Sequence, residues 1–395
     1  MKPVILFSII FIVFFNFCAP DVRNVLTDAE KQTRVMLQEI NKSRKNEKAI
    51  LPCTLTPEGE LKLIAANDWR SGFFPGVLWY LYESTGQPEW MEQAKTFTSY
   101  IENEKWNGVT HDMGFKIYCS FGNGYRLTND AAYREIIIQS AKTLSTRFNP
   151  TIGCIRSWDW NNEVWQFPVI IDNMMNLELL FAATKLTGDS SYYNMAVSHA
   201  NTTMKNHFRP DNSSFHVVDF DTFTGSAVKR ITHQGYSDES AWSRGQSWGL
   251  YGYVLCYRET GNKAYLGQAE KIAGFLLNNP SLPKDLVPYW DYNAPEIPNE
   301  PRDASAGAIM ASALYELSTY SENSKYYMEK ADLIIRNLTS QYRSAIGENK
   351  GFILLHSTGS KPGKWDIDEP VNYADYYFVE ALLRAKKLKE NKKLF

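Results

Sequence analysis

Leu186-Thr187-Gly188-Asp189-Ser190-Ser191-Tyr192, followed by Ala196, is the stretch from which the fold can be worked out. An apolar helix end runs into Gly188, which can adopt the left-handed conformation that terminates a helix. Asp189 can then cap the N-terminus of the next helix, and the ring of Tyr192 can pack in the corner between the two. The stretch therefore predicts a helix-turn-helix corner.

The same pattern recurs along the chain. It returns at residues 80–90 with Ala94 and 259–265 with Ala269, and more weakly at 127–133 and 320–326. Together with a last helix near 373–388, these corners predict close to a dozen helices in antiparallel pairs. The predicted fold class is therefore all-α, an (α/α)6 barrel or six-hairpin toroid, with a small β-hairpin near residues 213–230.

The composition is that of a soluble globular chain. Of 395 residues, 44% are hydrophobic and 22% charged, which excludes disordered, collagen-like and polytopic membrane proteins. The 42 Lys and Arg nearly balance the 44 Asp and Glu, so no general field attracts nucleic-acid phosphates, and nucleic acid is not an expected partner. Without an evident linker, residues 21–395 are expected to form a single domain.

Residues 1–20 have the layout of an export signal. A short basic start precedes an apolar run from Val4 to Phe15, which is too short for a stable membrane anchor. Cys18 follows this run and is a candidate for lipidation, with simple cleavage as the alternative. Either outcome predicts an exported protein, periplasmic or membrane-anchored as a lipoprotein.

The four other cysteines are widely spaced and form no C-x-x-C motif. This spacing favours buried free thiols, although an oxidising compartment leaves a disulfide open. The chain has no H-E-x-x-H, phosphate-binding or dinucleotide motif. What remains is a set of acidic, basic and aromatic residues in long inter-helix stretches, which suits acid–base chemistry on a sugar.

Two aspartates are the candidate proton-transfer groups. Asp172 stands alone in an otherwise apolar stretch, where desolvation would raise its pKa toward neutrality. Asp112 lies in the sequence His111-Asp112-Met113-Gly114-Phe115, before an apolar helix. Each could instead be an ordinary helix cap.

The other candidates are aromatic, basic or polar. Arg244 lies between tryptophans and could hold a carboxylate in a sugar-sized pocket, although packing against Trp is the plainer alternative. Trp69 and Trp158 could stack on sugar rings, with core packing as the rival interpretation. His216 and the pair His233-Gln234 precede Arg244, and each histidine could be an ordinary hydrogen-bonded residue.

Five ordered blocks resemble glycoside hydrolase family 88, the unsaturated glucuronyl hydrolases. The resemblance extends from about Asp68 to Tyr376, and the blocks are Trp69 with Ser71-Gly72-Phe73-Phe74-Pro75-Gly76, His111-Asp112-Met113-Gly114-Phe115, Ile171-Asp172-Asn173-Met174-Met175-Asn176, His233-Gln234-Gly235-Tyr236-Ser237, and Trp242-Ser243-Arg244-Gly245-Gln246-Ser247-Trp248. The resemblance implies an (α/α)6 barrel. It also implies an enzyme that removes the 4,5-unsaturated uronic acid from the non-reducing end of lyase-made oligosaccharides, such as those of glycosaminoglycans, by hydrating the C4=C5 vinyl ether.

The resemblance also implies roles for the matching residues. Asp172 would be the general acid and base, and Asp112 the second carboxylate. The implied substrate-binding residues are Trp69, His111, Trp158, His216, Gln234, Arg244 and Trp248. No metal or cofactor is expected, because a vinyl ether is already activated toward protonation.

Several points stay open. Ser357, Ser360 and Lys361 resemble a sulfate-binding stretch of some family members, although the lysine comes one residue early. The alternatives are an unsaturated rhamnogalacturonyl hydrolase like those of family 105, an ordinary (α/α)6 glycosidase, and a non-catalytic sugar-binding lipoprotein. The chain is expected to be a monomer or a weak homo-oligomer.

Overall fold

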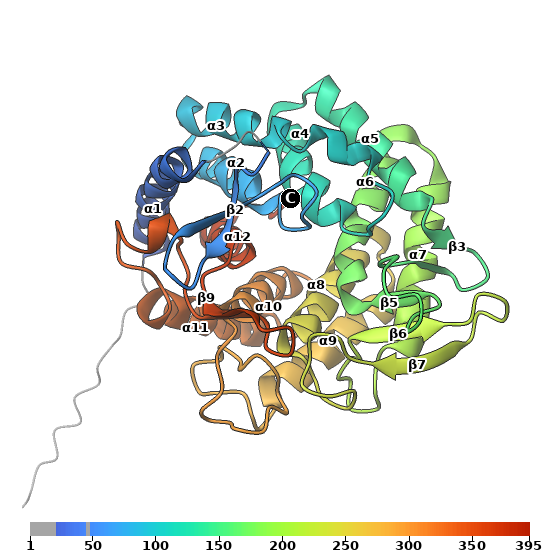
Figure 1. Ribbon diagram of the computed structural model, residues 1–395. Helices are drawn as coiled ribbons and strands as arrows, with labels where there is room; N and C mark the ends of the chain where they lie inside the picture. The colour runs from blue at the N-terminus through green and yellow to red at the C-terminus, as the bar shows by residue number, and fades with distance from the viewer. Residues whose placement is uncertain (1–20, 45–47) are drawn as a thin grey trace, which may run out of the picture.

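The computed structural model describes residues 21–44 and 48–395 and shows a ring of paired helices (Figure 1). The export signal and Cys18 lie outside the described residues. Within the described ranges the α-helices are α1 (Val22–Ser43), α2 (Phe73–Thr85), α3 (Pro88–Ser99), α4 (Asn123–Thr128), α5 (Ala131–Ser145), α6 (Leu177–Thr187), α7 (Ser190–Asn206), α8 (Ser243–Thr260), α9 (Lys263–Asn278), α10 (Ala304–Leu317), α11 (Ser324–Gln341) and α12 (Asn372–Lys389). The prediction of a mostly helical chain with paired helices is confirmed.

The helices form two concentric rings. Helices α2, α8, α10 and α12 surround the centre, together with α6 and a π-helical segment, Gly114–Gly122, that continues into α4. Each packs against an outer partner: α3, α9, α11 and α1 for the first four, α7 for α6, and α5 for the π-helical segment with α4. Every residue of α10 is buried, whereas α1 buries one stripe, as inner and outer helices should. The predicted (α/α)6 barrel is thereby confirmed.

The corners are built largely as the sequence predicts. Gly86, Gly188 and Gly261 end their helices in the left-handed conformation, at φ of 67°, 76° and 66°. The side chains of Asp189 and Asn262 accept backbone N–H groups at the start of the following helices. The corner at 320–326 differs, because no side chain caps α11 and the preceding helix ends without a left-handed residue.

Short strands interrupt the ring. The predicted hairpin is confirmed as β6 (Val217–Phe220) and β7 (Ala227–Ile231), and β5 (Pro168–Ile170) adds a third strand to it. Three further two-stranded ribbons were not predicted: β1 (Leu51–Leu55) with β2 (Leu61–Ile64), β3 (Phe148–Asn149) with β4 (Cys154–Ile155), and β8 (Ser357–Ser360) with β9 (Trp365–Glu369).

The stretch that contains Asp112 leads directly into the inner ring. Residues 104–124 contain the π-helical segment, whose first backbone N–H groups, at Gly114 and Phe115, donate to Oδ1 of Asn176. A Cβ atom at Gly114 would lie 2.7 Å from the Cα atom of Asn176, so only glycine allows this contact. Gly114 weakens the helical pattern of this stretch in the sequence, yet it is required by the packing of the segment.

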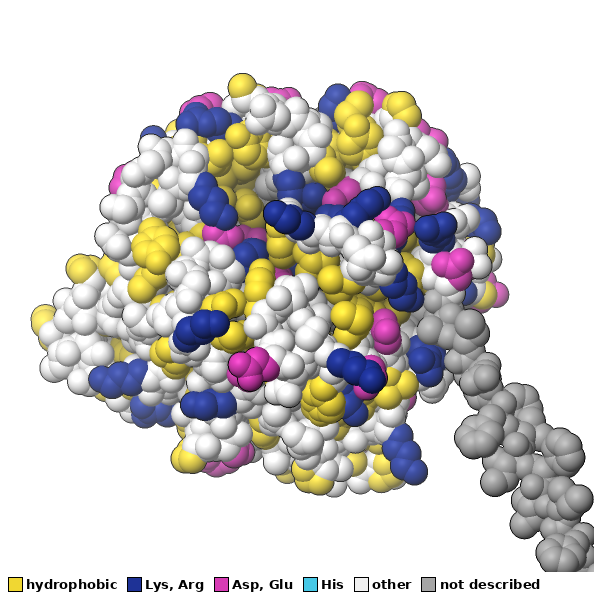
Figure 2. Space-filling model, turned by 180° about the vertical axis from the view of Figure 1, so that it is seen from behind, with side chains coloured by type: hydrophobic (Ala, Val, Ile, Leu, Met, Phe, Trp, Pro, Cys, Tyr) yellow, Lys and Arg dark blue, Asp and Glu magenta, His cyan; other side chains and the backbone are white. Residues whose placement is uncertain are grey.

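Cys53, Cys119, Cys154 and Cys256 are buried free thiols, which is the favoured interpretation of their spacing. In the described part of the chain, no helix is both long and apolar enough to cross a bilayer. Basic and acidic side chains are interspersed on the face seen from behind (Figure 2), in keeping with the near-zero net charge.

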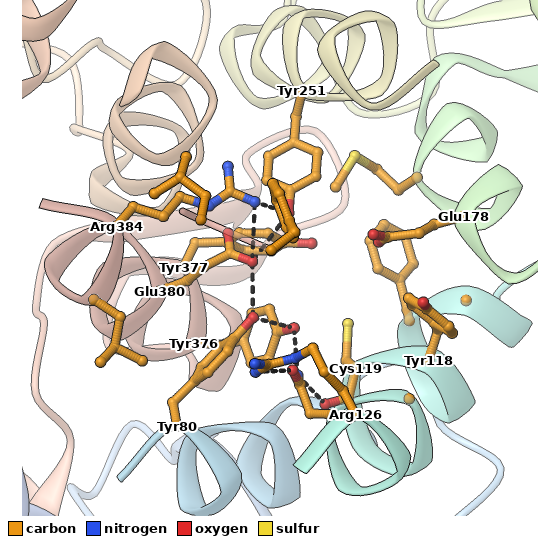
Figure 3. A pocket seen from close by; sticks show the side chains of 18 of the residues that line it. Tyr80, Tyr118, Cys119, Arg126, Glu178, Tyr251, Tyr376, Tyr377, Glu380 and Arg384 are labelled. Carbon is orange, nitrogen blue, oxygen red and sulfur yellow. Dashed lines mark hydrogen bonds and ion pairs between the residues drawn. The ribbon is translucent and has the colours of Figure 1, made fainter. Parts of the chain in front are cut away.

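A small rear cavity of about 90 Å³ lies along the barrel axis near the end of the chain. Glu380 is central to it and accepts hydrogen bonds from the hydroxyls of Tyr80 and Tyr251 at 2.8 and 3.0 Å (Figure 3). Arg384 lies 3.4 Å from the same carboxylate, and Glu178 pairs with Arg258. Because these charges are matched by side chains of the chain itself, the rear cavity is best explained as a polar part of the barrel core.

Candidate active site

A larger cavity of about 260 Å³, here called the front cavity, brings together most of the predicted site residues. Of these, its walls contain Trp69, His111, Asp112, Trp158, Asp172, Gln234 and Arg244. They come from the turn before α2, the start of the π-helical segment, the stretch around β5, the segment before α8, and α8 itself. Residues far apart in the sequence thus meet in one aromatic cavity that contains two carboxylates.

Asp172 is the buried acid of this cavity. It follows β5 in the first turn of a 3-10 segment, Ile171–Asn176, and only 7% of its surface is exposed. Burial raises the pKa of Asp172 to about 7, and the nearby charge of Asp112 adds to this, while Arg244 acts in the opposite direction. Its Oδ2 is buried and accepts no hydrogen bond from the described residues, so this oxygen has no donor that would stabilise a negative charge on it.

Asp112 has more partners than Asp172. Its Oδ2 accepts a hydrogen bond from the hydroxyl of Thr110 at 2.5 Å, and its Oδ1 lies 3.2 Å from Nε2 of His111. The helix that follows begins after Met113 and has no side-chain cap, so the capping alternative does not apply to Asp112. The two aspartates therefore occupy different environments within one cavity, the pattern of acid–base pairs.

His216 does not line the front cavity but supports Asp172 from behind. Its Nδ1 accepts the backbone N–H groups of His233 and Gln234, each at 3.1 Å. Its Nε2 lies 3.8 Å from Oδ2 of Asp172. Burial lowers the pKa of His216 well below its ordinary value, so the ring stays neutral.

Arg244 is both a wall residue and a structural one. Its Nη1 donates to Asp303 and to the backbone oxygen of Thr358, at 2.7 and 2.6 Å, and its Nη2 donates to the oxygen of Gly359 at 2.6 Å. The guanidinium also lies over the ring of Trp242 at 4.6 Å. The packing alternative is thus part of its role, although the side chain also lines the cavity, where its buried Nε has no partner among the described residues.

The three predicted tryptophans differ in their exposure and in their position relative to the front cavity. Trp69 is half-buried against Phe115 and Tyr373, and Trp158 stacks on Trp160 with ring centroids 4.8 Å apart. Trp248 is fully buried and is not a wall of the front cavity. It lies beneath the cavity against the ring of Phe115, with ring centroids 5.1 Å apart, and its indole nitrogen has no hydrogen-bond partner among the described residues.

The residues that resemble a sulfate-binding stretch lie outside the front cavity. Ser357 and Ser360 are buried on β8, and the ammonium of Lys361 forms an ion pair with the buried carboxylate of Glu300. Glu300 is in turn held by the indole N–H of Trp290 at 2.8 Å. The early position of the lysine therefore directs its charge to a partner within the chain.

Several lining residues were missed by the sequence reasoning: Val109, Thr110, Phe115, Ser157, Trp160, Ile170 and Trp365. Trp365 belongs to a late hairpin with no sequence signal that connects it to the aspartates. Thr110 and Trp160 could have been suspected from their positions two residues from Asp112 and Trp158. His233 also lines the cavity, next to Gln234.

One sequence match to a nucleophile motif has a structural explanation. Gly245-Gln246-Ser247-Trp248-Gly249 has the spacing G-x-S-x-G, but the whole stretch lies inside α8 rather than on a strand-to-helix turn. The buried hydroxyl of Ser247 donates to backbone oxygens of Ser243 and Ala306. Ser247 is therefore a packing residue. Among the described residues, no group of three or more potential ligand side chains gathers as a metal site.

Comparison with known proteins places this geometry in a family. Residues 40–377 match the sequence profile of Glycosyl Hydrolase Family 88. An unsaturated glucuronyl hydrolase of Formosa agariphila is 53% identical over 85% of this chain and 84% of its own. An unsaturated chondroitin disaccharide hydrolase of Streptococcus pneumoniae is 33% identical over 84% and 85%. The crystal structure of an unsaturated glucuronyl hydrolase specific for heparin has a TM-score of 0.89, with 43% identity over 93% of this chain and 98% of its own.

Proposed function

The chain belongs to glycosyl hydrolase family 88, and on this premise we propose that it removes a 4,5-unsaturated glucuronate from the non-reducing end of lyase-made glycosaminoglycan oligosaccharides. The observation that carries the proposal is Asp172: an acid with a pKa raised to about 7, in an aromatic cavity that also contains Asp112. Such an acid can give up a proton near neutral pH and take one back.

The proposed reaction is a hydration. Protonated Asp172 gives its proton to C4 of the C4=C5 double bond, and positive charge develops at C5 and the ring oxygen. A water molecule adds to C5 and returns a proton to the Asp172 carboxylate. The hemiketal so formed opens to a ketone at C5, and the hemiacetal left at C1 releases the next sugar as an alcohol. One water is consumed, and Asp172 ends as it began.

The other residues have supporting roles in this proposal. Asp112, held by Thr110, would bind ring hydroxyls and balance the charge that develops in the ring. The guanidinium of Arg244, which lines the cavity, would attract the uronate carboxylate, together with the amide of Gln234. Trp69 would stack on the unsaturated ring, because it offers a half-buried aromatic surface in the cavity wall.

The test follows the ultraviolet absorbance of the unsaturated ring. Lyase-made disaccharides from chondroitin, heparin and hyaluronan are incubated with the wild-type chain, with Asp172→Asn and with Asp112→Asn. We expect wild-type turnover to remove the absorbance, and Asp172→Asn to lose at least about 1,000-fold in kcat while staying folded. Turnover by Asp172→Asn at the wild-type rate would rule out its role as the acid.

The remaining alternatives are separated by two further substrates. A pectin-derived unsaturated disaccharide tests a rhamnogalacturonyl specificity like that of family 105. A saturated glucuronide tests an ordinary glycosidase, which would cleave it with both aspartates. We expect neither to be a good substrate. A chain that binds sugar but turns over none of these compounds would instead be a binding protein.

We also propose that the protein is exported and carries a lipid on Cys18. The support is the apolar run at residues 4–15 followed by Cys18. Expression in a bacterial host with radiolabelled palmitate, followed by fractionation, tests it: wild type should be labelled and Cys18→Ala should not. Unlabelled protein released from the membrane fraction would favour simple cleavage, and protein retained in the cytoplasm would exclude export.

A further inference from the structure

The β8–β9 hairpin places the ring of Trp365 in the wall of the front cavity. Two glycines of the hairpin make room for this ring. A Cβ atom at Gly359 would lie 2.3 Å from the ring, and one at Gly363 would lie 2.5 Å from its Nε1. Because no larger residue could stand at either position without displacing it, the ring has a fixed seat on the hairpin.

The hairpin is tied to both sides of the cavity. The backbone oxygen of Gly359, beneath the Trp365 ring, accepts hydrogen bonds from Arg244 at 2.6 Å and from Gln234 at 3.1 Å. Asp366, the residue after Trp365, pairs with Arg70 at 2.8 Å, beside Trp69. Trp365 is therefore positioned relative to the groups that hold the uronate in the proposed function, although it is not one of them.

The charges around Trp365 do not favour an anion. Strand β9 carries three carboxylates, those of Asp366, Asp368 and Glu369. The cations packed against the hairpin already have carboxylate partners: Arg70 pairs with Asp68 and Asp366, Arg244 with Asp303, Lys361 with Glu300, and His356 lies 2.8 Å from Asp368. The exposed Lys364 stands on the hairpin turn and does not line the cavity. An anionic group here would meet an aromatic ring and like charges.

We propose that Trp365 is a specificity-determining residue, whose ring binds the sugar that follows the uronate, and that the β8–β9 hairpin selects a neutral sugar there over a sulfated one. The inference rests on the proposed function. The apolar C–H face of a neutral sugar can stack on the indole, whereas a sulfate next to β9 would lose its water without gaining a free cation.

The test compares the unsaturated disaccharides of unsulfated chondroitin and of its 4-sulfated and 6-sulfated forms. Wild type should have a kcat/KM at least about 10-fold lower on the sulfated forms, which corresponds to one unpaired anionic contact. For the unsulfated disaccharide, Trp365→Ala should raise KM about 10-fold with little change in kcat, and Trp365→Phe should restore most of the affinity. If Trp365 had only a structural role, Trp365→Ala would also lower kcat, and Trp365→Phe would not restore KM selectively.

Two charge variants test the selection against sulfate. Glu300→Gln releases Lys361 and should narrow the preference for the unsulfated form, whereas the control Lys364→Ala should leave the preference unchanged. Loss of the preference in Lys364→Ala, or a wild-type preference for a sulfated form, would overturn the proposal.

Binding to an Asp172→Asn background, measured by calorimetry, separates this inference from the proposed function. Absence of wild-type turnover would defeat the proposed function. If the unsulfated disaccharide binds Asp172→Asn with Trp365→Ala as tightly as Asp172→Asn alone, only the role of Trp365 is defeated. An affinity about 10-fold weaker supports that role.

Discussion

Nε2 of His216 lies 3.8 Å from Oδ2 of Asp172, on the side of the ring opposite its two backbone partners. Because Nδ1 accepts the N–H groups of His233 and Gln234, the ring must carry its proton on Nε2, toward the carboxylate. Burial keeps the pKa of His216 well below its ordinary value. The neutral histidine therefore directs its Nε2–H toward the carboxylate. Between these two residues, Asp172 is the one that changes its protonation state near neutral pH.

The rate should fall as the pH rises through about 7. Burial raises the pKa of Asp172 to about 7, and the proposed step requires the protonated acid, so kcat/KM should drop about 10-fold per pH unit above it. Measurements of kcat/KM between pH 5 and 9 give the descending limb of the pH profile. A rate that is flat to pH 9 would contradict the assignment.

Asp172→Asn should stabilise the fold at pH 8 but not at pH 4. The pKa of Asp172 is raised in the folded state, so the stability that its protonated form supplies is present below the unfolded value and is lost as the pH passes about 7. Asparagine cannot ionise, and scanning calorimetry at pH 8 should show a Tm about 2 °C above that of wild type. Glu178 and Asp375 also have pKa values raised to about 7, and they affect both chains equally. A variant that is less stable at pH 8 would disprove the expectation.

Thr110 should matter through its hydroxyl. Thr110→Val removes the donor to Asp112 at nearly constant volume, and we expect kcat/KM to fall about 10- to 100-fold, as for the loss of a hydrogen bond to a charged group. Thr110→Ser keeps the hydroxyl and should retain most of the activity. Equal activities of the two variants, both folded by circular dichroism, would show that the hydrogen bond is dispensable.

Gly359→Ala should disturb the site, whereas Gly267→Ala should not. The added Cβ at Gly359 would lie 2.3 Å from the ring of Trp365, whereas at Gly267 in α9 nothing lies within 4 Å. Thermal unfolding should show a loss of about 1–3 kcal/mol for Gly359→Ala, with a raised KM for the unsulfated disaccharide. Gly267→Ala should be neutral or stabilising by about 0.5–1 kcal/mol. If Gly359→Ala has the same stability and KM as Gly267→Ala, the close packing of the Trp365 ring against Gly359 would be disproved.

The barrel could be predicted because its corners are local. Gly188 and Asp189 define a turn from adjacent residues, and the repetition of that turn determines the architecture. The short ribbons could not be found in this way. Strand β8 consists of Ser357–Ser360, which are polar or small residues, and its burial comes from packing against the barrel rather than from its own pattern.

The candidate site was partly predictable for the same reason. Asp112 and Asp172 stand out as polar residues in distinctive local sequences, and both line the front cavity. Trp248 is equally distinctive but is buried below it, because α8 faces neighbours on all sides and its sequence does not show which side meets the cavity. Trp365 was missed because its place depends on contacts such as Arg70 with Asp366, which join residues nearly 300 positions apart.

The ion pair between Arg70 and Asp366 has a consequence for biosynthesis. The front cavity takes one wall from the first inner helix turn and another from a hairpin close to the last helix. A nascent chain that still lacks β8, β9 and α12 would lack one wall of the cavity in which the sugar would bind. Hydrolytic competence should therefore appear late, when nearly the whole polypeptide has left the ribosome, and truncated chains should be inert rather than partly active.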